Sequence, residues 1–226
     1  TLKQGLADDL LSGNVRVEGL RISNPEGYTT DHLMQFETFD VKLQPMSLFS
    51  DTVKLEQMEL NNLDLIIEQR IMESNASVVL GNLERLKKES PKEPGKTIEV
   101  DYAVIRNVTA HFVLMSDLGS DKPITVQVPE IEISQFSTAN RSGYVAGELA
   151  RQLVPLILAA VVEKGRGTVP GDFLNPLELK VSSSVESLTD QAQVAVEGVK
   201  GGLEDLLTKP GESEGGEEPN RTGLGG

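Results

Sequence analysis

Two histidines are the side chains of this sequence best suited to proton transfer or metal binding near neutral pH. They are the only histidines among 226 residues, and His32 follows Asp31 in a predicted turn. Alternation places His111 on the opposite strand face from Ala110 and Phe112. An acid–base pair or a metal site would require both imidazoles to converge on a carboxylate. Because they are far apart in sequence and belong to no motif, we interpret both as surface or structural residues.

No motif indicates catalysis or a bound cofactor. The sequence lacks the G-x-S-x-G, phosphate-loop and dinucleotide fingerprints. Its acidic residues between 116 and 121 do not follow the spacing of an EF-hand. Cysteine is absent, which excludes a zinc–thiolate site, a disulfide and a thiol nucleophile. We therefore expect no catalytic residue, no metal site, no cofactor and no enzymatic activity.

Charge and aromatic content exclude a nucleic-acid-binding protein. The formal net charge is −14, whereas a phosphate backbone requires a concentrated basic surface. Aromatic residues make up 4% of the chain and tryptophan is absent, so a base-stacking platform is not expected. The longest apolar run, Leu153 to Val162, is about half of the roughly 20 residues that a membrane-spanning helix needs.

One pattern recurs along the first 135 residues: two alternating apolar residues, a polar or Gly/Pro pair, and two more alternating apolar residues. Alternation predicts a strand with one apolar face. The second and third apolar residues of the pattern are three positions apart, which would move the later ones to the opposite face. A β-bulge accommodates the extra residue, and it bends and twists the strand. The pattern occurs at Val15, Val17, Leu20 and Ile22, at Met34, Phe36, Phe39 and Val41, at Val53, Leu55, Met58 and Leu60, and at Val126, Val128, Ile131 and Ile133.

These strands predict an α+β fold with a bent, strongly twisted antiparallel sheet, an open half-barrel or β-groove whose apolar face is covered or closed by helices. The pair Asn61-Asn62 either repeats the interruption within one long strand or forms a hairpin turn. A short turn at 45–51 is expected to hold Leu48 and Phe49 against the sheet. Strands are expected at about 15–23, 34–43, 52–69, 98–114 and 124–136.

Helical periodicity divides the chain into three regions. Residues 1–136 form the predicted β-groove region, with the end of a helix at 1–12 and a short helix at about 77–88. C-terminal helices are predicted within 144–207, the first at 144–164 and a weaker one at 181–207. The segment 210–226 is an acidic, Gly-rich tail that is too polar to bury, and we expect it to be disordered.

About residues 10–135 resemble the opening repeat of AsmA-like bacterial envelope proteins, of the AsmA/TamB type. The order and spacing of several pieces carry the resemblance, and it fades in the C-terminal helices. Ser74-Asn75 before a Leu-bearing helix is similar to the helix that closes the family's first repeat. The other matching residues are Leu11-Ser12-Gly13, Val15, Val17, Gly19-Leu20, Ile22, Asn24-Pro25, Gly27-Tyr28, Phe39-Asp40-Val41, Leu43, Pro45, Ser47-Leu48, Ser50-Asp51, Val53, Leu55, Met58, Leu60 and Leu63.

The resemblance implies a protein of the cell envelope, on the periplasmic side, anchored by an N-terminal segment upstream of Thr1. Long relatives form β-grooves that carry lipid acyl chains between membranes. This chain has room for one or two repeats, too few to bridge two membranes.

We therefore expect a non-catalytic, AsmA-like protein that binds or shields lipid acyl chains and supports membrane organisation or lipid transport. The alternative is a periplasmic scaffold that carries no lipid, because its sheet packs on its own helices or on a partner. Across both hypotheses, the expected partners of the protein are acyl chains or a membrane, an envelope protein, or a second copy added at the sheet edge. Nucleic acid is not an expected partner. The residues expected to face the groove are Val15, Val17, Leu20, Ile22, Phe39, Val41, Leu55, Met58 and Leu60.

Overall fold

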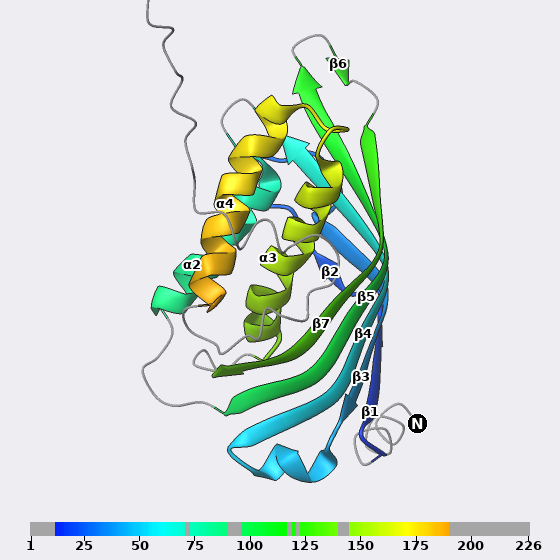
Figure 1. Ribbon diagram of the computed structural model, residues 1–226, viewed down its shortest axis with the longest axis vertical. Helices are drawn as coiled ribbons and strands as arrows, with labels where there is room; N and C mark the ends of the chain where they lie inside the picture. Colours follow the sequence, from blue (N-terminus) through cyan, green and yellow to red (C-terminus); the bar gives the residue numbers. More distant parts are fainter. Residues whose placement is uncertain are drawn as a thin grey trace, which may run out of the picture.

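A seven-stranded sheet carries three α-helices on one of its sides in the computed structural model, which describes residues 12–70, 73–89, 96–116, 119–120, 123–139 and 145–189 (Figure 1). The predicted α+β fold with an open sheet is confirmed, since the sheet does not close into a barrel. The strands are β1 (Asn14–Glu18), β2 (Arg21–Ile22), β3 (Met34–Leu43), β4 (Thr52–Gln69), β5 (Thr97–Ser116), β6 (Gly119–Ser120) and β7 (Ile124–Ala139). The helical elements are the 3-10 turn η1 (Pro45–Phe49) and the α-helices α2 (Asn75–Glu89), α3 (Val145–Gly165) and α4 (Gly171–Thr189).

The sheet is mixed, so the expectation of an all-antiparallel sheet is wrong at one pair of strands. Its order is β1–β3–β4–β5–β7, with β2 also on β3 and β6 on β5. Strand β4 runs parallel to β5, whereas the β1–β3, β3–β4 and β5–β7 pairs are antiparallel. The reason is α2, which lies between β4 and β5 in sequence and returns the chain to the end of the sheet where β4 began.

Strands β4 and β5 bury apolar residues in the same irregular sequence of steps. The register pairs Leu55 with Val100 and Leu60 with Ile105, so the two three-residue steps of β4 coincide with those of β5. The buried apolar residues of the core cluster are Val53, Leu55, Met58, Leu60, Leu63, Leu65 and Ile67 on β4, and Ile98, Val100, Ala103, Ile105, Val108, Ala110 and Phe112 on β5; Val104 of β5 is buried outside this cluster.

The second of these steps lies at two asparagines with left-handed backbone. Asn62 and Asn107 have φ of 53° and 55°, a region that asparagine tolerates better than most residues. The Asn107 side-chain amide donates a hydrogen bond to the Asn62 side-chain oxygen at 3.0 Å. The predicted interruption is therefore present within one continuous strand, β4, and the hairpin alternative is wrong. The β4–β5 register does not shift at Asn62 and Asn107, because the three-residue step occurs at paired positions of both strands. The β3–β4 register, in contrast, shifts between Lys42 and Leu43.

Helix α3 lies between the sheet and the other two α-helices. Every residue from 153 to 162 is buried, which explains why this helix is apolar on all sides. It packs on β7 and against α2 and α4, and Figure 1 shows the sheet curving toward these helices. Its predicted bounds of 144–164 agree closely with the observed helix.

The remaining expectations differ in detail or fall outside the described residues. Helix α4 begins at Gly171, ten residues before the predicted start, because the N–H groups of Phe173 and Leu174 bond to the carbonyl of Pro170 and begin the helix there. The predicted turn at η1 is present, but Phe49 is exposed, so its expected packing on the sheet is wrong. The expected helix at 1–12, apart from Ser12, the stretch 190–207 and the tail 210–226 lie outside the described residues.

Candidate functional site

The nine residues expected to face a groove lie on one face of the sheet. Residues paired directly across antiparallel strands point to the same face. Leu20 lies level with Phe36, whose N–H donates to the Leu20 carbonyl at 2.8 Å. The rows across the sheet, written from its β1–β2 edge inwards, are Val15–Val41–Met58, Val17–Phe39–Leu60, Leu20–Phe36–Leu63, Ile22–Met34–Leu65 and, further along, Leu43–Leu55.

The helices cover only part of this apolar face. Leu55, Met58 and Leu60 on β4 are buried in the same core cluster as the apolar residues of α3. These three predicted groove residues therefore contact the protein's own interior. Over β4, β5 and β7 the expected groove is filled by its own helices.

The other six predicted residues form an apolar margin along the β1–β2 edge of the sheet. Val17 is 39% exposed and Leu20 is 37% exposed, whereas the remaining four are half-buried against the core. The exposed fraction of the side chains therefore rises along each row from β4 toward the β1–β2 edge of the sheet. The apolar margin consists of Val15, Val17, Leu20, Ile22, Phe39 and Val41.

A polar hollow of about 540 Å³ lies on β1, β3 and β4, and two residues of the apolar margin, Val15 and Val41, also line it. Its charged groups bond to neighbours within the sheet: Arg16 pairs with Asp40, and Lys42 pairs with Glu56 at 2.8 Å. Such cross-strand pairs stabilise a solvated sheet face. The hollow is lined by Asn14, Val15, Arg16, Asp40, Val41, Lys42, Gln57 and Glu59.

The two histidines, interpreted from the sequence as separate residues, meet on one carboxylate. The Nε2 atom of His32 lies 2.9 Å from Oδ2 of Asp64, and the Nε2 atom of His111 lies 3.3 Å from Oδ1 of the same residue. His111 Nδ1 also lies 3.1 Å from the Thr125 hydroxyl. The contacts join the segment before β3 to β4, β5 and β7. The sequence did not indicate Asp64, because the contact depends on the parallel pairing of β4 with β5.

We interpret this cluster as structural, although both imidazoles do converge on one carboxylate. Each imidazole contacts a different carboxylate oxygen, and within the described ranges no group of three or more His, Cys, Asp or Glu residues is arranged to hold a metal ion. An acid–base site also needs a cleft that receives a substrate. Neither the polar hollow nor the small cavity between α2, α3 and α4 is lined by His32, Asp64 or His111.

A double-mutant cycle with His32→Ala and Asp64→Ala is expected to give a coupling free energy of about 1 kcal/mol. His32 is nearly buried, so its contact is shielded from water. The His111→Ala cycle with Asp64→Ala serves as the matched control, and its coupling should be smaller because this contact is longer and more exposed. Urea denaturation of the four variants in each cycle measures both values. Equal couplings would contradict this ranking.

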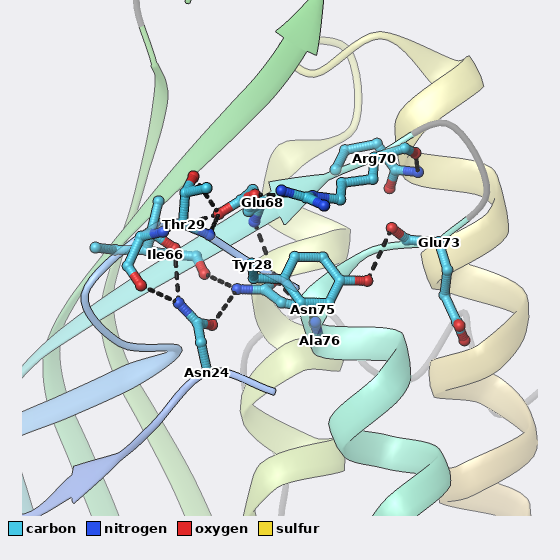
Figure 2. A network of polar contacts seen from close by, with 11 residues as sticks. Asn24, Tyr28, Thr29, Ile66, Glu68, Arg70, Glu73, Asn75 and Ala76 are labelled. Atoms are coloured by element: carbon cyan, nitrogen blue, oxygen red, sulfur yellow. Dashed lines mark hydrogen bonds and ion pairs between the residues drawn. The ribbon is translucent and has the colours of Figure 1, made fainter. Parts of the chain in front are cut away.

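A buried carboxylate, Glu68, anchors the loop between β2 and β3 (Figure 2). It accepts hydrogen bonds from the backbone N–H groups of Thr29 at 2.8 Å and Thr30 at 2.9 Å, and one from Arg70 Nε at 3.3 Å. Burial acts to raise the pKa of Glu68, but these donors, with the Thr29 hydroxyl, outweigh it and the pKa lies below its ordinary value. The carboxylate is thus stabilised in its charged form inside the protein.

Asn75, the first residue of α2, joins the same network to the helix. Its side-chain oxygen accepts the backbone N–H of Glu68 at 2.9 Å, and its amide donates to the Ile66 carbonyl at 2.8 Å and to the Asn24 side-chain oxygen at 2.7 Å. Ser74 caps the start of α2, because its hydroxyl accepts the Ser77 N–H at 3.1 Å. Each residue of this cluster that Figure 2 labels makes at least one hydrogen bond within the protein, so we interpret the cluster as structural.

The apolar margin, which the helices leave uncovered, is therefore the candidate functional surface. No helix within the described residues is long and apolar enough to cross a bilayer. Neither protein-family models nor curated protein sequences match the chain.

Proposed function

We propose that this protein is a non-catalytic, AsmA-like module of the cell envelope that binds lipid acyl chains along its apolar margin. The observation that supports the proposal is the continuation of the apolar face beyond its covering helices, onto Val17 and Leu20 at the sheet edge. The periplasmic side belongs to the same proposal, because residues 10–135 resemble AsmA-like envelope proteins.

Burial supplies the binding energy in this mechanism. An acyl chain lying along the margin would contact Val15, Val17 and Leu20 and the half-buried Phe39 and Val41, with about 0.8 kcal/mol for each methylene removed from water. The lipid headgroup would remain at the wet edge beyond β1. Because these contacts are non-directional, the module should discriminate chain length more strongly than headgroup type.

A scaffold that carries no lipid is the second candidate, and the packing of α3 favours it. This helix packs on β7 and shares one buried core with β4 and β5, while α2 contacts β4. In that case the margin would be completed by a protein partner.

Replacing Leu20 by aspartate is expected to weaken uptake of a fluorescent long-chain fatty acid at least tenfold. A carboxylate in the margin would lose its hydration when the acyl chain binds, and a tenfold change corresponds to about 1.4 kcal/mol. Val17→Asp should act in the same direction, because Val17 is the other exposed member of the margin.

Leu179→Asp is the matched control, since Leu179 is 74% exposed on α4 and the substitution adds the same charge. It should leave uptake unchanged. Circular dichroism checks that all three variants are folded. Uptake that survives both margin substitutions would contradict acyl-chain binding at this surface.

A further inference from the structure

The turn η1, between β3 and β4, is held by hydrogen bonds rather than being a loose loop. The buried Ser47 hydroxyl donates to the Gln44 carbonyl at 2.6 Å and accepts the Lys54 N–H at 2.9 Å. Ser50 closes the turn, because its N–H and hydroxyl both bond to the Ser47 carbonyl. Leu48 packs half-buried against the core. The backbone therefore has one defined orientation toward solvent.

This fixed turn presents two large apolar side chains to water. Met46 is 79% exposed and Phe49 is 86% exposed, which makes them the most exposed large apolar residues that the described part of the chain contains. They are three positions apart, and side chains at that spacing lie above one another in a 3-10 helix. Met46 and Phe49 thus form one small apolar tip, while Leu48 anchors the turn from within.

The tip lies at the same end of the sheet as the start of the apolar margin. Gly13, directly before β1, sits so close to Pro45 of η1 that an added Cβ would lie 3.3 Å from the proline ring. Figure 1 shows the beginning of β1 and the turn after β3 at one end of the molecule. The margin thus begins beside η1 at Val15, and its exposed residues Val17 and Leu20 lie further along the sheet, level with Phe39 and Phe36 of β3.

We propose that η1 inserts Met46 and Phe49 into the outer layer of a phospholipid bilayer and so sets this end of the sheet on a membrane. The inference goes beyond the proposed function, because it names a membrane contact that does not depend on acyl-chain uptake.

Area favours a bilayer over a second copy of the chain. A phenylalanine buries roughly 150–250 Å² at most. The two side chains of the tip thus fall well short of the roughly 800 Å² that each partner buries in a standard protein interface. Insertion into the headgroup and acyl boundary needs no complementary surface, because its strength scales with the apolar area that is buried.

The charges beside the tip fit a zwitterionic bilayer. Lys42 pairs with Glu56, Lys54 lies 3.7 Å from Glu99, and the Lys96 ammonium donates to the Leu48 carbonyl. The neighbourhood of the turn thus combines lysines with carboxylates, although the whole chain carries a net charge of −14. Strongly anionic vesicles should therefore repel the protein, whereas phosphatidylcholine vesicles should not.

Flotation of the full chain with phosphatidylcholine vesicles tests the proposal. The double substitution Met46→Ser and Phe49→Ser should reduce the vesicle-bound fraction at least tenfold, because both exposed side chains lose their apolar contact with the bilayer. Leu179→Ser is the matched control, an exposed apolar residue on α4, and it should float as the parent chain does. Because Met46 and Phe49 contribute little to the core, the double variant should keep its circular dichroism spectrum.

Three outcomes would overturn the proposal. They are no flotation of the parent chain, unchanged flotation of the double variant, and a dimer in light scattering that the double variant converts to a monomer. The last would assign the tip to a second copy. The Leu20→Asp variant separates this proposal from the acyl-chain proposal, since it should float normally while failing to take up fatty acid.

Discussion

Replacing Leu158 by alanine is expected to lower the free energy of unfolding by about 3 kcal/mol. Leu158 is fully buried in the middle of α3, between the sheet and the helices α2 and α4. Removing three carbon atoms there loses their burial and leaves a cavity that the surrounding elements cannot fully close. Urea denaturation followed by circular dichroism measures the change.

Leu179→Ala on α4 is the control for this prediction, because it is the same substitution at an exposed position. It should change the free energy of unfolding by no more than about 0.5 kcal/mol. Equal, small effects at both leucines would show that α3 does not fill the apolar face. In that event the helix would have to be regarded as detachable, and the whole face as available to lipid.

Replacing Glu68 by glutamine is expected to lower the free energy of unfolding by about 2 kcal/mol at neutral pH. The substitution keeps the shape of the side chain but removes the charge that strengthens its bonds to Thr29, Thr30 and Arg70. An amide can still accept from the backbone, so the loss should be smaller than for Leu158→Ala.

The Glu68 contribution should also depend on pH with a defined sign. The pKa of Glu68 is lower in the folded protein than its ordinary value of about 4.3. Its stabilisation is therefore fully present above that value and is lost as the pH falls through the folded pKa. The difference in unfolding free energy between the parent chain and Glu68→Gln should shrink from neutral pH toward pH 3. A difference that grew on acidification would contradict the network in Figure 2.

The strands were predictable because alternation and its interruptions are local properties. Strands β3 and β4 have the predicted bounds, and the Asn62 interruption lies where the pattern placed it. The parallel pairing of β4 with β5 was not predicted, although two signals indicated it. A helix separates the two strands, and the same order of two- and three-residue steps occurs in 53–67 and 98–112. Two strands whose buried residues are spaced in the same order can align those residues side by side only if the strands run in the same direction.

The candidate sites depended more strongly on contacts that a sequence does not reveal. The packing position of α3 decides which part of the apolar face stays open. The sequence does not reveal this, because a covered strand face and an open one have the same pattern of apolar residues. The meeting of His32 and His111 on Asp64 likewise requires the strand order. Phe49 was expected to pack inwards because it is apolar, whereas the three-residue turn of η1 directs it outwards.

The most direct test of acyl-chain binding at the apolar margin is native mass spectrometry, with lipid extraction, of the protein purified from a membrane-containing host. We expect the parent chain and Leu179→Asp to carry phospholipid or fatty acid, and Leu20→Asp and Val17→Asp to have the mass of the protein alone. A parent chain free of lipid, which also takes up none on incubation, would contradict the proposal. That result would leave the margin as the contact surface of a protein scaffold.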